Sequence, residues 1–108
     1  MASRTNQTLL SNVSAPTGAS RKWIPTAGRI YSVDACLDAG ATAAVINIYG
    51  ANSNHGLGTL ICTLTLSVAT TSDGTTFSDD DGGWFFVAAE LVSSTGAVKS
   101  VSTCVEKD

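Results

Sequence analysis

The chain has 108 residues, of which 44% are hydrophobic and 14% are charged. This length suits one small domain, and the charged fraction is well below the roughly 25% of average soluble domains. Thirteen serines and fourteen threonines account for much of the difference. The composition excludes a coiled coil, which needs far more Glu, Lys and Leu. It also excludes a membrane-spanning helix, because no apolar run approaches the roughly 18 residues that one requires.

Basic residues are concentrated near the N-terminus. Residues 1–29 hold four basic residues and no acid, a net charge of +4, whereas residues 30–108 hold nine acids and two lysines, a net charge of −7. We therefore expect electrostatic guidance of this end toward an acidic surface or a neighbouring copy of the chain. The alternative is a tail that these charges merely keep solvated. Nucleic acid is not an expected partner, because there is no dense Lys/Arg run and the rest of the chain is acidic.

Residues 1–22 have weak periodicity and are punctuated by Pro, Gly and Ser. We predict that they form an extended arm outside a folded domain of residues 23–108. No apolar stretch follows the first basic residue, so no secretory signal is expected. The arm is predicted to contact a partner surface through three basic and three aliphatic side chains, which are Arg4, Arg21, Lys22, Leu9, Leu10 and Val13.

From residue 23 onward the hydrophobic pattern has a period of two, which is typical of strands with one buried face. In the clearest run, residues 58–68, the residues Leu60, Cys62, Leu64, Leu66 and Val68 share one face. β-Branched residues, which favour strands, dominate these runs. Strands are predicted over residues 29–37, 42–50, 58–68, 84–92 and 97–105.

Glycine-containing segments separate the predicted strands. Residues 38–42 and 94–97 predict short hairpin-type connections, and residues 50–58 and 69–83 predict longer loops. Five or more strands with such turns predict an all-β fold, a small antiparallel β-sandwich of the jelly-roll or Ig-like kind. In an alternative interpretation, residues 38–47 begin as a helical turn.

The chain has three cysteines, Cys36, Cys62 and Cys104, each within a predicted strand. The absence of a CxxC motif or a Cys/His cluster argues against a zinc site. Buried free thiols acting as small hydrophobic side chains are the favoured interpretation. One disulfide between strands is the alternative.

Residues with catalytic chemistry are few. His55 is the single histidine, and no nucleophile-elbow motif accompanies it. The acidic run at residues 79–81 has poor geometry for an acid/base pair, because adjacent residues of an extended chain point to opposite faces. Its oxygens suit calcium, but the register of an EF-hand is missing, so a solvated loop is favoured. We expect no enzyme activity, no catalytic residue, no cofactor and no bound metal.

The run at residues 84–92 is apolar on both faces. Because only one face of a strand can look into its own core, we predict that the other packs on a second copy of the chain. Trp84, Phe85 and Phe86 are the candidate subunit interface of a homo-oligomer, for example a trimer. In an alternative hypothesis, Trp84, Tyr49 and His55 form a sugar-binding surface.

Two stretches resemble small β-sandwich proteins of tailed-phage virions. Residues 43–56, AAVINIYGANSNHG, followed by TLICTLTL, resemble a strand and loop of such proteins, and GGWFFVAAELVSSTGAVKSVSTCV resembles their closing hairpin. The loop lacks its usual aromatic residue, which argues against sugar binding.

The resemblance implies a non-enzymatic virion structural protein, most like a capsid decoration (cement) protein. Such a protein is made in the host cytoplasm and binds the major capsid protein on the capsid surface. A tail or head–tail junction protein and a carbohydrate-binding β-sandwich module are the alternatives.

Overall fold

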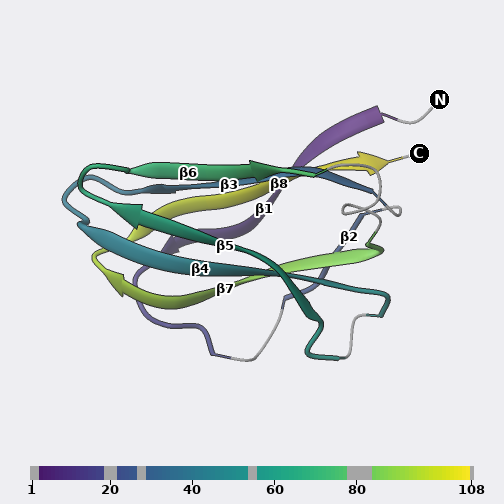
Figure 1. The fold of residues 1–108 in the computed structure, drawn as a ribbon, viewed down its shortest axis with the longest axis horizontal. Helices are drawn as coiled ribbons and strands as arrows, with labels where there is room; N and C mark the ends of the chain where they lie inside the picture. The colour runs from purple at the N-terminus through teal and green to yellow at the C-terminus, as the bar shows by residue number, and fades with distance from the viewer. Residues whose placement is uncertain (1–2, 19–21, 27–28, 54–55, 78–83, 108) are drawn as a thin grey trace.

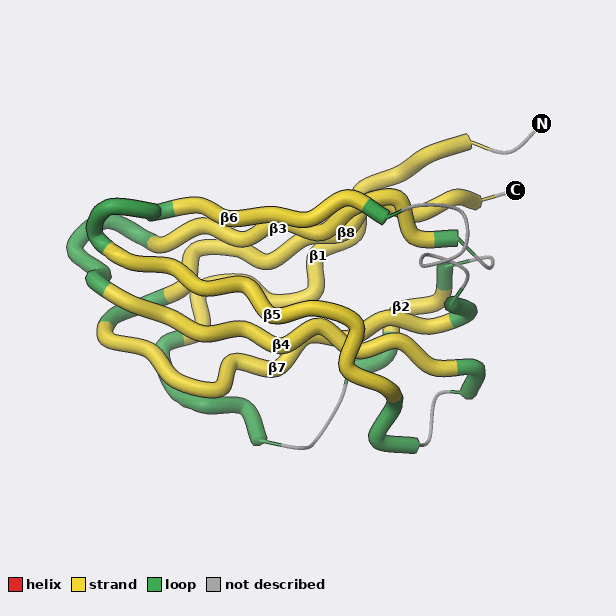
Figure 2. The backbone as a smooth tube through the Cα atoms, viewed as in Figure 1, coloured by secondary structure: helices red, strands yellow, loops and turns green. Residues whose placement is uncertain are grey.

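The computed structural model describes residues 3–18, 22–26, 29–53, 56–77 and 84–107. Eight β-strands and no helix occur in this part of the chain (Figure 2), so none of its segments is a helix that could cross a membrane. The strands are β1 (Ser3–Val13), β2 (Ile24–Pro25), β3 (Ile30–Leu37), β4 (Ala43–Ala51), β5 (Thr59–Ser67), β6 (Ser72–Thr76), β7 (Phe86–Thr95) and β8 (Val98–Lys107).

The strands form two sheets that face each other (Figure 1). Sheet A has the order β1-β8-β3-β6 and sheet B the order β2-β7-β4-β5, and every strand pair is antiparallel. Alternate residues of each strand meet between the sheets in one apolar core, because successive side chains of a strand point to opposite faces. The predicted antiparallel β-sandwich is confirmed. Its largest fully buried apolar side chains include Ile30, Ile46, Ile48, Leu64, Leu66 and Leu91.

The N-terminal segment belongs to the sandwich. Strand β1 pairs with β8 along its whole length, from Ser3 opposite Lys107 to Val13 opposite Val98. The prediction of an arm outside the domain is therefore wrong for residues 3–13. The period-two signal was weak because the register shifts between Thr8 and Leu10. The shift is a β-bulge, after which the inward-facing residues no longer continue the alternation of the residues before it.

The segment after β1 also lies on the body. Thr17 donates its backbone N–H to the carbonyl of Leu91 at 3.0 Å, and the backbone N–H of Leu91 donates to Thr17 Oγ1 at 3.0 Å. The hydroxyl of Ser94 donates to the carbonyl of Ser14 at 3.1 Å. The chain thus passes from sheet A to the outer side of β7 in sheet B, so the domain boundary predicted at residue 22 is not observed.

The two connections predicted as hairpins, residues 38–42 and 94–97, join strands of different sheets. β3 and β8 lie in sheet A, whereas β4 and β7 lie in sheet B. The two connections touch each other, since a Cβ on Gly96 would lie 2.6 Å from the Cα of Ala41. Gly96 also has a φ of 94°, which glycine adopts without the strain other residues incur. The helical alternative for residues 38–47 is wrong, because a turn there leads directly into β4.

Strand β6 lies within the segment predicted as a long loop. Its sequence, SDGTT, has no apolar alternation, so the period-two signal is absent. It pairs with β3 and lies against β5 of the other sheet, where Asp73 Oδ2 accepts a hydrogen bond from the backbone N–H of Thr65 at 3.1 Å. This contact closes one side of the sandwich.

Candidate functional site

The aliphatic residues predicted to contact a partner are used in the core. Leu9 is 5% exposed and belongs to the buried cluster, and Leu10 and Val13 pack against that cluster. They are therefore unavailable for docking, which corrects that prediction. Lys22 is exposed. The side chains of Arg4 and Arg21 lie outside the described part of the structure, so their predicted contacts are not placed.

The aromatic run at the start of β7 divides between core and surface. Trp84 packs against the core, with its ring so close to Gly50 that a Cβ there would lie 2.5 Å from it. Phe86 is half-buried, whereas Phe85 is 55% exposed. The buried residue Thr26 donates its hydroxyl to the carbonyl of Trp84 and its backbone N–H to the carbonyl of Phe85, the latter at 3.0 Å. These bonds hold the backbone beneath the exposed Phe85 ring.

Three exposed apolar side chains, which we call the apolar rim, lie at one end of sheet B. Leu57 is 65% exposed, Leu60 is 51% exposed, and Phe85 is the third member. They share this end because β4 ends there while β5 and β7 begin there (Figure 1). The pairing of Gly50 with both Thr59 and Val87 fixes the three strands in register.

Leu60 was predicted on the buried face of its strand. The register shifts where Ile48 and Tyr49 pair with β5, so the run that starts at Leu60 does not continue on the same face. The exposure of Leu57 was not predicted from the sequence, although its position between two glycines in a predicted loop indicated it. Of the rim residues, Phe85 was the one singled out from the sequence.

A hollow of about 440 Å³ adjoins the rim between β5 and β6. Its apolar lining includes Leu60, Phe77 and Trp84, and threonine side chains complete it. Such a surface favours contact with apolar or mixed groups.

The outer face of sheet B carries a chain of polar side chains. Thr63 donates its hydroxyl to Asn47 Oδ1 at 2.8 Å, and Asn47 Nδ2 donates to the hydroxyl of Tyr49 at 3.2 Å. The Tyr49 hydroxyl donates in turn to Glu90 Oε1 at 3.4 Å. Of the residues in the sugar-binding hypothesis, Tyr49 lies on this face and Trp84 packs against the core. His55 and residues 79–81 lie outside the described residues.

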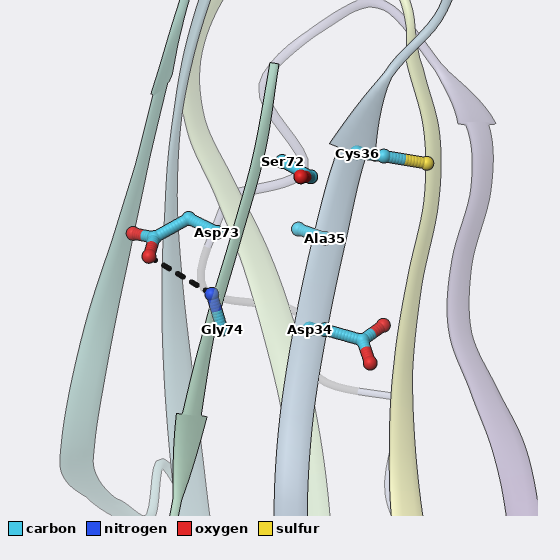
Figure 3. A pocket seen from close by; sticks show the side chains of 6 residues that line it. All are labelled: Asp34, Ala35, Cys36, Ser72, Asp73 and Gly74. Carbon is cyan, nitrogen blue, oxygen red and sulfur yellow. Dashed lines mark hydrogen bonds between the residues drawn. The ribbon is translucent and has the colours of Figure 1, made fainter. Parts of the chain in front are cut away.

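The outer face of sheet A is made of small side chains around Asp34. A shallow depression of about 480 Å³ is lined there by residues of β3 and β6. Figure 3 shows the carboxylates of Asp34 and Asp73 pointing in opposite directions. Asp34 Oδ1 accepts a hydrogen bond from the Ser102 hydroxyl at 2.9 Å, whereas Asp73 Oδ1 accepts one from the Gly74 backbone N–H at 2.9 Å. The two carboxylates therefore do not form an acid/base pair.

The three cysteines are free thiols, each half-buried. The pKa of the Cys62 thiol is raised from 9.0 to about 11, chiefly by burial and also by the nearby charge of Asp73, against a hydrogen bond with Thr75 that lowers it. Such a thiol is a poor nucleophile, because the thiolate is the reactive form. In the described part of the chain, no three His, Cys, Asp or Glu side chains gather as a metal site would require.

Comparisons with known proteins identify one solved structure with a similar fold among the matches. No family model matches the chain, and no curated protein does. Among solved structures, the crystal structure of the SPBc2 prophage-derived protein YomS is similar, with a TM-score of 0.55 and 20% sequence identity over 99% of this chain and 96% of that chain. The two proteins share a fold over almost their whole lengths.

Proposed function

We propose that the protein is a non-enzymatic structural protein of a phage virion, which binds and stabilises the capsid exterior as a decoration protein. The fold shared with a prophage-derived protein supports the phage context. The proposed partner is the major capsid protein.

The apolar rim is the observation that carries this proposal. Exposed apolar side chains that gather at one place mark interaction surfaces more often than scattered ones do. Leu57, Leu60 and Phe85 all lie at the end of sheet B where β5 and β7 begin, whereas Val68, 71% exposed, follows the opposite end of β5. The rim therefore replaces the N-terminal residues as the surface that contacts the capsid.

The rim is also preorganised for docking. The hydrogen bonds from Thr26 fix the backbone at Trp84 and Phe85, and the Trp84 ring lies on Gly50. Ordering flexible loops and side chains costs free energy on association, so a surface that is already ordered binds more tightly. Removal of an aromatic anchor from the centre of an interface costs about 2 kcal/mol or more.

The test uses particles of the phage or prophage that carries the gene. Mass spectrometry of purified virions should detect the protein, and antibody labelling in electron microscopy should place it over the head. Particles made without the gene should assemble and lose heads faster on heating, and added purified protein should restore their stability. Label confined to the tail or the head–tail junction, or absence from purified virions, would contradict the proposal.

A further inference from the structure

Among the described residues, the edge strands are β1 and β6 in sheet A and β5 and the two-residue β2 in sheet B. β5, β6 and the outer side of β7, where β2 lies, are covered. β5 and β6 lie against each other, with Asp73 accepting the backbone N–H of Thr65. The outer side of β7 carries β2 and then Thr17, which exchanges two hydrogen bonds with Leu91. Covering an edge in these ways prevents strands of other molecules from pairing with it.

The edge of β1 is different. One side of β1 pairs with β8, and among the described residues no backbone hydrogen bond reaches its other side. The antiparallel pair of β1 and β8 also extends past β3, because β3 begins at Ile30, opposite Val105, while β1 and β8 continue to Ser3 and Lys107 (Figure 1). An edge with open N–H and C=O groups is a template for another strand.

We propose that β1 pairs with β1 of a second copy of this chain, antiparallel, about a two-fold axis at Asn6. The two copies of sheet A would then form one continuous eight-stranded sheet. Such an interface is self-complementary, as a two-fold axis requires. The proposal is independent of the capsid-binding function.

The proposed register uses the regular part of β1, which runs from Ser3 to the bulge between Thr8 and Leu10. An axis at Asn6 keeps the paired residues, Arg4 to Thr8, within this stretch. Residues directly opposite in an antiparallel pair share a face, so Asn6 meets Asn6 and Arg4 meets Thr8 of the partner subunit.

An unsatisfied hydroxyl supports the same register. The Oγ1 of Thr5 is buried and has no hydrogen-bond partner among the described residues, and a buried polar atom without a partner is costly. About an axis at Asn6, Thr5 lies opposite Gln7 of the partner subunit, on the face that points into the sandwich. A χ1 rotation turns the Thr5 hydroxyl toward this edge, where it accepts a hydrogen bond from the Gln7 amide.

Disulfide trapping tests the register. Asn6 pairs with Cys104 within the chain, so the test uses Asn6→Cys in a Cys104→Ser background. Ser100 and Ser102 already occupy the same face of β8, so this background is mild. Mild oxidation should link two copies through residue 6. Thr8→Cys in the same background is the matched control, because in this register the two thiols lie four residues apart and should not link.

Charge repulsion tests the same interface without a covalent bond. In Asn6→Lys the two lysines are directly opposite, and like charges opposite each other destabilise strand pairs, so the dimer dissociation constant in sedimentation equilibrium should rise roughly tenfold or more. Thr65→Lys places the same charge on the covered edge of β5 and should leave it unchanged. A monomeric wild-type protein, equal linking at residues 6 and 8, or equal dissociation constants for the two lysine variants would overturn the proposal.

Discussion

Two groups of large apolar side chains in this small domain differ in their exposure to solvent. Leu9, Leu10 and Val13 in β1 pack on or into the core, whereas Leu57, Leu60 and Phe85 form the exposed rim. Leu9 and Leu10 are adjacent in the sequence, and Phe85 stands between two aromatic residues, so apolar neighbours in the sequence do not separate the two groups. The difference lies in what faces them, because β1 lies at the edge of sheet A with sheet B beneath it, while the rim lies at the end of sheet B where β5 and β7 begin.

The two groups therefore make different contributions. Burial of a large apolar side chain stabilises a fold by roughly 1.5–3 kcal/mol, and β1 contributes at that scale. The rim contributes little to stability, and its exposed area is available for binding. Substitutions in β1 should change folding, and substitutions in the rim should change docking.

Removal of β1 should have the largest effect. Deletion of residues 2–13 leaves β8 paired on one side alone, with β3, and exposes the core beneath Leu9. The loss is comparable to the 5–15 kcal/mol total stability of a typical domain, so the truncated chain should show no cooperative thermal unfolding by circular dichroism. A truncated protein that melts like the full chain would show that β1 is dispensable, and the account of sheet A would be wrong.

A single substitution in each group should reproduce the contrast. Leu9→Ala removes a 5% exposed side chain and should cost about 2–5 kcal/mol of unfolding free energy. Leu57→Ala is the matched control, because its side chain is 65% exposed and surface substitutions usually stay within about 0.5 kcal/mol. Urea unfolding measures both. Equal losses for the two variants would remove the distinction between core and rim.

A substitution at Gly50, where the core meets the rim, should lower the stability of the fold. A Cβ there would lie 2.5 Å from the Trp84 ring, so Gly50→Ala must displace that ring. Overpacking of this kind costs about 1–3 kcal/mol, and it should also change the tryptophan fluorescence. Gly56→Ala is the control, because the nearest atom to its Cβ would be 4.0 Å away. An unchanged spectrum and midpoint for Gly50→Ala would contradict the placement of Trp84.

Cys62, in β5, should make a smaller contribution to stability, and this contribution should depend on pH. Burial first, and then the charge of Asp73, raise the pKa of this thiol from 9.0 to about 11 in the folded protein, although the hydrogen bond with Thr75 opposes them. Between these values the unfolded chain releases a proton that the folded chain keeps, so stability falls as the pH rises from about 9 through about 11. Urea midpoints of Cys62→Ala should decline less steeply over that range than those of the wild type. Parallel declines would contradict a buried thiol.

Much of the fold could be predicted from the sequence, because regular strands with one buried face carry a period of two. β3, β4, β5, β7 and β8 coincide closely with predicted strands. β1 was missed because its bulge and Asn12, with a φ of 53°, interrupt the alternation. β6 was missed because it contains no large apolar residue.

The sheet to which each strand belongs could not be predicted. Residues 38–42 and 94–97 have the composition of hairpins, yet both cross between the sheets. Only tertiary packing, such as the contact of Gly96 with Ala41, distinguishes a crossing from a hairpin. For the same reason the candidate site was recognised in part, at Phe85, while the exposure of Leu60 depended on a register shift between β4 and β5.

Binding to stripped phage heads tests the central claim about the apolar rim most directly. Labelled wild-type protein, Phe85→Ser and Val68→Ser are titrated onto heads from which the native protein has been removed. Phe85 is 55% and Val68 is 71% exposed, at opposite ends of sheet B, so both variants should fold. Loss of an aromatic anchor worth about 2 kcal/mol predicts that Phe85→Ser binds roughly 30-fold more weakly, while Val68→Ser binds like the wild type. Equal affinities for all three proteins would contradict the account.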